Sequence, residues 1–169
     1  SAGGVDQNAV LEYQEEETDG GDAAVKVVIK GLLGGHSGLE INQGRANANK
    51  LMGRLVQDAM ANFEARLCSW VGGNMRNAIP SHAEVVLTLP KENVAALKED
   101  CIADWKKVFA DEFAFVEKQL ELICEDVERP AKQVPAEIGD NLVNAICACH
   151  NGPMRMIAEI PDVVETSSN

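Results

Sequence analysis

The chain has 169 residues, 46% of them hydrophobic and 25% charged, so it can bury a core and is not disordered in composition. Its net charge of −12 disfavours nucleic acids and anionic membrane surfaces as partners. No apolar run reaches the roughly 18 residues that a membrane span needs, and the first residues lack a signal-peptide pattern.

The first half of the chain predicts a strand, a glycine loop and a helix. Residues 15–22 form an acidic turn, which is typical of a solvated loop. The β-branched run at 25–30 predicts a strand that ends at a glycine loop, GLLGGHSG, over residues 31–38. Apolar residues at helical spacing then predict a helix over 46–62.

The second half predicts strands over 65–71 and 84–89, a long helix from Lys91 to about Phe113, and a strand over 120–127. The first six elements thus follow the order βαββαβ. This order predicts an α+β fold of the ferredoxin-like type, an antiparallel sheet with two or more helices on one face.

Two elements follow this unit, a helix over 139–150 and a strand that begins at Asp162. The odd number of cysteines, dispersed on mostly apolar segments, indicates reduced and buried thiols and favours a cytoplasmic protein. They are Cys68, Cys101, Cys124, Cys147 and Cys149.

The chain lacks the residue sets of a self-sufficient hydrolase. It has three histidines and no HExxH, Cys-x-x-Cys, Gly-x-Ser-x-Gly or P-loop sequence. Cys147, Cys149 and His150 are close in sequence, but positions one and two apart on a helix face different ways, which disfavours a metal site there. We therefore expect part of an enzyme rather than a whole one.

His36, within the glycine loop, is the strongest catalytic candidate. Glycines allow positive φ and close backbone approach, which favours an exposed imidazole. Such a ring can donate a hydrogen bond to a developing oxyanion, an interaction worth about 10²–10³ in rate. The alternative is structural, because Ser37 and Glu40 have the spacing of a capping box that would make His36 a turn residue without chemistry.

Four motifs occur in a meaningful order, KGLLGGHSGLEI at 30–41, NANKL at 47–51, GGNMRNAIP at 72–80 and VVETSSN at 163–169. Together they resemble the lid domain of the aminoacyl-histidine dipeptidases, also called Xaa-His dipeptidases or peptidase D. Residues 1–4 resemble the point where the chain of that family leaves its catalytic domain. The resemblance spans nearly the whole chain.

The resemblance implies a dimeric enzyme whose catalytic domain binds two zinc ions and cleaves dipeptides with a C-terminal histidine, carnosine among them. It implies that His36 stabilises the oxyanion of the tetrahedral intermediate, in the partner subunit's site, and that Asn77 contacts substrate. No role for Arg76 follows from it.

The resemblance also implies how the chain divides. Residues 1–24 would be a linker from a catalytic domain, and residues 25–169 a lid and dimerisation domain that is incomplete at its C-terminal end. Metal ligands and a general-base glutamate would lie outside these segments, so we expect this chain to bind no catalytic zinc and to be inactive alone. A non-catalytic ferredoxin-like regulatory or dimerisation module is the open alternative.

Overall fold

The computed structural model describes residues 3–169; the expectation for Ser1 and Ala2, as part of the exit from a catalytic domain, lies outside the described residues. Four antiparallel strands form the main sheet in the order β3-β4-β2-β5. Their bounds are β2 Asp22–Lys30, β3 Arg66–Gly72, β4 Ala83–Pro90 and β5 Glu121–Val127. This interleaved order is ferredoxin-like, so the predicted fold class is confirmed.

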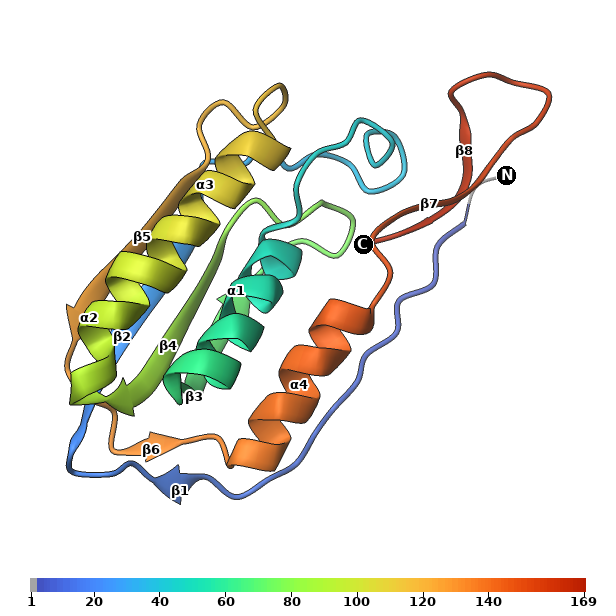
Figure 1. The fold of residues 1–169 in the computed structure, drawn as a ribbon. Helices are drawn as coiled ribbons and strands as arrows, with labels where there is room; N and C mark the ends of the chain where they lie inside the picture. Colours follow the sequence, from blue (N-terminus) through green and yellow to red (C-terminus); the bar gives the residue numbers. More distant parts are fainter. Residues whose placement is uncertain (1–2) are drawn as a thin grey trace.

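Three helical segments cover one face of this sheet (Figure 1). The first is α1 and the last is α4; between them a 3-10 turn, α2, a π-helical turn and α3 form one continuous segment. The bounds are α1 Ala48–Phe63, the 3-10 turn Lys91–Asn93, α2 Val94–Ala96, the π-helical turn Leu97–Ile102, α3 Ala103–Glu112 and α4 Ala136–Ala148. Within residues 3–169, none of the helices has the length and apolar character needed to cross a membrane.

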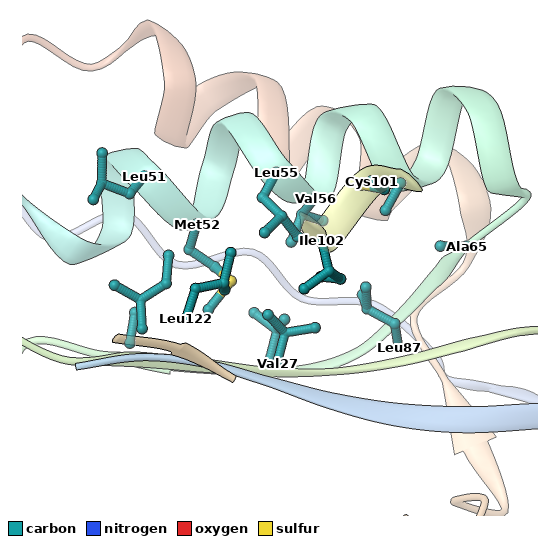
Figure 2. Close-up of a cluster of buried hydrophobic side chains, with 14 of the residues drawn as sticks. Val27, Leu51, Met52, Leu55, Val56, Ala65, Leu87, Cys101, Ile102 and Leu122 are labelled. Carbon is teal, nitrogen blue, oxygen red and sulfur yellow. The ribbon is translucent and has the colours of Figure 1, made fainter. Parts of the chain in front are cut away.

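The core lies between the sheet and these helices because strand residues alternate between the two faces. Val27 of β2 and Leu87 of β4 are fully buried and point toward the helices, whereas Lys26 and Glu84 form an ion pair at 2.9 Å on the opposite face. Figure 2 shows Leu55, among others, packing from α1 onto the strand side chains.

Helix α1 begins and ends where its caps require. The side chain of Asn47 accepts hydrogen bonds from the backbone N–H groups of Asn49 and Lys50 at 3.0 and 3.3 Å, which satisfies two donors of the first turn. Glu64 ends the helix in the left-handed region, at φ 56°. The predicted helix over 46–62 is therefore confirmed with a shift of its ends.

Two small sheets lie outside the main one. Strand β1 (Glu16–Glu17) pairs with β6 (Lys132–Gln133), and β7 (Gly152–Met156) pairs with β8 (Val164–Ser168). The acidic segment 15–22 was expected to be a loop, but it contains β1 and the start of β2. Strand β7 escaped the sequence analysis because its glycine and proline are typical of turns and its residues are mostly exposed.

The cysteines are free, but the expectation that all of them are buried is wrong. Cys101 is buried between the helices and the sheet, and burial, with Asp58 beside it, raises the pKa of its thiol to about 12. Cys149 is exposed because α4 ends immediately before it. Helical periodicity cannot reveal that its side chain lies beyond the last turn.

Candidate functional site

Two loops pair with each other at one end of the sheet. We call residues 31–47, between β2 and α1, the histidine loop, and residues 73–82, between β3 and β4, the asparagine loop. The backbone N–H of Ser37 donates to the carbonyl of Asn77 at 3.1 Å, and that of Ile79 donates to Gly35 at 2.8 Å. His36 and Ala78 form a β-bridge between these bonds. The loops thereby bring the two sequence-predicted site residues, both exposed, onto neighbouring backbone segments.

The imidazole of His36 is held by one of its two nitrogens. Its Nδ1 accepts hydrogen bonds from the backbone N–H groups of Gly38 at 3.0 Å and Leu39 at 3.3 Å. An accepting Nδ1 carries no proton, so the uncharged ring carries its proton on Nε2. Among the described residues Nε2 has no hydrogen-bond partner, which leaves this N–H available to an external acceptor.

The capping box expected between Ser37 and Glu40 does not form, and His36 takes the part of Ser37 in the turn that replaces it. The carboxylate of Glu40 accepts from the backbone N–H of His36 at 2.7 Å, and Nδ1 of His36 takes the place that a Ser37 hydroxyl was expected to fill. The segment after it is a turn rather than a helix. The interpretation of His36 as a turn residue thus accounts for Nδ1, which binds the turn backbone, but it assigns no hydrogen bond to Nε2.

Glu40 connects this turn to Arg45 through an ion pair of 2.7 Å. The hydrogen bond from the backbone N–H of His36 is the largest cause and lowers the pKa of the Glu40 carboxyl below its usual value. Burial opposes this lowering, and the Arg45 guanidinium adds to it. Arg45 also donates to the carbonyl of Gly34 at 2.8 Å. The result is a charged bridge between the two arms of the histidine loop.

The loop requires glycine at position 35. Its φ is +123°, a backbone angle that residues with a side chain rarely adopt. A Cβ there would also collide with the guanidinium of Arg45 and the carboxylate of Glu40. The second glycine of the motif therefore lets two charged side chains approach the backbone closely.

The last motif of the sequence lies against both loops. From β8, the Ser167 hydroxyl donates to the carbonyl of Ser37 at 3.0 Å, and just beyond β8 the Asn169 amide donates to the carbonyl of Ala78 at 3.0 Å. Figure 1 shows the two loops and the C-terminus at the same end of the molecule. Distant segments of the sequence therefore form one structural unit around His36.

The NANKL motif joins the same unit from α1. The backbone N–H of Ala48 donates to the carbonyl of Pro80 at 2.8 Å, and the Asn49 side chain accepts from the indole N–H of Trp70 at 3.0 Å. All four motifs found in the sequence thus meet at this end. Arg76 is the exception within them, since its exposed guanidinium pairs with Asp6 at 2.6 Å, toward the N-terminal segment.

The end of α4 does not fit a metal ion. The ammonium of Lys50 donates to the carbonyls of Ile146, Cys147 and Cys149 at 2.8, 2.6 and 2.6 Å, so a cation already occupies the negative end of this helix. Across residues 3–169 no group of three or more His, Cys, Asp or Glu side chains could hold a metal ion. A zinc pair would need ligands from other segments.

Glu117 is a residue that the sequence analysis missed. It lies in the turn between α3 and β5, is 6% exposed, and accepts hydrogen bonds from the backbone N–H groups of Leu33 at 2.8 Å and Ala46 at 2.9 Å. No motif marks it, because its partners are backbone groups about 70 to 85 positions away. A lone acidic residue after a helix is usually solvated.

Comparisons with known proteins agree with the fold described above. The chain is 34% identical over 168 residues to the cytosol non-specific dipeptidase of Escherichia coli (strain K12). This alignment covers 99% of this chain and 34% of that protein. The crystal structure of aminoacylhistidine dipeptidase from Vibrio alginolyticus superposes with a TM-score of 0.87 at 36% identity, over 91% of this chain and 31% of that one. The chain thus spans about a third of the length of these relatives.

Residues 27–117 match the family model described as the peptidase dimerisation domain. These residues run from β2 to Glu117 and include both paired loops. The resemblance found in the sequence is confirmed, and the relatives that match over nearly the whole chain are dipeptidases. The chain belongs to the M20 peptidase dimerisation domain family.

Proposed function

We propose that this chain is the lid and dimerisation domain of a cytoplasmic zinc dipeptidase that hydrolyses Xaa-His dipeptides such as carnosine. Residues 1–24 would be the linker and 25–169 the lid domain, acting as a homodimer with two zinc ions bound by other segments. The names of the two similar proteins support dipeptide hydrolysis, and that of the Escherichia coli protein supports a cytosolic location. The observation that carries the proposal is the exposed His36 ring, which backbone donors hold by Nδ1.

The proposed chemistry of His36 follows from that hydrogen bonding. When water attacks a peptide carbonyl, negative charge develops on the carbonyl oxygen. The Nε2–H of His36 would donate to that oxygen, in the site of the partner subunit. Because the backbone already holds the ring, little reorganisation accompanies the reaction, which is the condition for a large electrostatic contribution.

Asn77 would act on the substrate rather than on the reacting atoms. Its carbonyl holds the Ser37 N–H at 3.1 Å, so the position of its side chain is coupled to the histidine loop. An exposed amide can both donate and accept, which suits the polar groups of a dipeptide. We propose no step for the zinc ions, because the described residues, 3–169, do not form a site for them.

The test is the complete protein assayed against dipeptides with and without a C-terminal histidine. His36→Ala should lower kcat about 10²–10³-fold while metal content is unchanged. His82→Ala is the matched control, because His82 is an exposed histidine whose side chain lies 3.8 Å from the Glu84 carboxylate, and this variant should retain activity. An unchanged kcat in His36→Ala refutes the catalytic role, and absence of any hydrolysis favours the regulatory module instead.

The isolated chain gives a second test of the same proposal. It should hydrolyse no dipeptide and retain no zinc after dialysis, since His36 acts on a carbonyl that other segments activate. Zinc-dependent cleavage by residues 1–169 alone would contradict this division of labour.

A further inference from the structure

We propose that Glu117 is a positioning residue that closes the histidine loop at its base and thereby fixes the ring of His36; its catalytic meaning rests on the function proposed above. The carboxylate of Glu117 accepts hydrogen bonds from two backbone N–H groups, and these belong to the two ends of that loop. Leu33 lies just after β2 and Ala46 just before α1, so a single side chain joins both arms.

The burial of Glu117 makes this contact specific. A carboxylate that is 6% exposed has lost most of its contact with water, and among the described residues it has no lysine, arginine or histidine within ion-pair distance. Its compensation comes from the two backbone donors, one for each oxygen. Hydrogen bonds to a charged group are stronger than those between neutral groups, so each bond resists opening of the loop.

The backbone is shaped to bring Glu117 to this place. Gly31, at the start of the loop, has φ +76°, and a Cβ there would collide with the carbonyl oxygen of Gln119. The absence of a side chain lets the turn after α3 approach the loop. In that turn the N–H of Glu117 donates to the carbonyl of Phe113 at 2.9 Å, which fixes the direction from which the carboxylate enters.

The loop is thus closed by two carboxylates at successive levels. Glu117 joins its base, and Glu40, with Arg45, joins its arms beside His36. Closure at the base limits the movement of the arms, and the arms carry the backbone donors that hold Nδ1. Glu117 therefore acts on the histidine through the loop and touches no reacting atom.

Hydrogen exchange in the unmodified chain gives the first test. The amides of Leu33 and Ala46 lie outside helices and strands, yet both should exchange as slowly as amides of the sheet. Exchange at the rate of solvent-exposed amides would overturn the proposal without any variant.

Glu117→Gln gives the second test, because an amide offers one accepting oxygen in place of two. Exchange at Leu33 and Ala46 should become roughly ten- to hundredfold faster. The ring-nitrogen chemical shifts of His36 should move toward a mixture of tautomers, which a merely structural role would not cause. Glu121→Gln is the control with the same charge change, since Glu121 is exposed and pairs with Lys30 at 3.6 Å, and it should change neither signal.

Should Glu117→Gln fail to fold, Glu117→Asp keeps the charge but shortens the side chain by one methylene, so that it cannot reach both donors. It should produce the same changes at Leu33, Ala46 and His36. Unchanged exchange and unchanged ring shifts in a folded variant at this position would refute the positioning role.

The complete enzyme separates this inference from the proposed function. Glu117→Gln should lower kcat between about tenfold and a hundredfold, and the double variant with His36→Ala should be no slower than His36→Ala alone. If the losses of kcat in the two single variants multiply in the double variant, the positioning role is overturned. An unaffected His36→Ala enzyme, with the exchange results intact, would refute the proposed function and leave the loop closure standing.

Discussion

The helix-and-sheet body and the paired loops of this domain are held together in different ways. The body is stabilised by apolar side chains that are fully buried, such as Val27, Leu55 and Phe109. The loop end is held by hydrogen bonds between side chains and backbone groups: Glu40 and Glu117 accept from backbone N–H groups, and Arg45 donates to a carbonyl. Apolar packing is non-directional, whereas these bonds fix orientation. We infer that the body determines stability and the loop end determines chemistry.

The body should respond to a cavity with a large loss of stability. Phe109 is fully buried, and Phe109→Ala should lower the free energy of unfolding by about 3–5 kcal/mol. Urea unfolding measures this effect. In the folded fraction the ring-nitrogen shifts of His36 should be unchanged, and a shift there would break the separation between the two regions.

Adding a methyl group at the loop end should lower the activity of the complete enzyme. Gly35→Ala places a Cβ against Arg45 and Glu40 at a φ of +123° and should lower kcat of the complete enzyme at least about tenfold. Gly44→Ala is the matched control, because Gly44 lies in the same loop with φ +70° and has nothing within 4 Å of an added Cβ. Equal losses in both variants would show that backbone strain, and not the collision, is responsible.

The smallest expected effect is electrostatic. Glu40 has a lowered pKa, so its contribution to loop order is complete above the ordinary value of 4.5 and is lost as the pH falls through the lowered one. The carboxyl carbon shift of Glu40 should titrate below pH 4.5. Arg45→Gln should restore the ordinary pKa only in part, because the N–H of His36 is the larger cause. Titration at or above 4.5 in the unmodified chain contradicts this account.

The same contrast explains what the sequence could predict. Strands β2 and β4 and helix α1 follow from periodic apolar residues, because periodicity records which face is buried. The pairing of His36 with Ala78 does not, since it depends on backbone hydrogen bonds that flank two residues 42 positions apart in the chain. The glycine loop and the motif resemblance predict His36 as a site residue, and the resemblance alone predicts Asn77. Neither could reveal Glu117, whose partners are backbone groups of residues without a motif.

The central claim is that the backbone holds His36 by Nδ1 and leaves Nε2–H for an oxyanion. Nitrogen-15 spectra of the imidazole in the unmodified chain, recorded where the ring is uncharged, test it most directly. We predict a protonated Nε2 and an unprotonated, hydrogen-bonded Nδ1. A ring protonated mainly on Nδ1 would contradict the account, because that nitrogen could not then accept from Gly38 and Leu39.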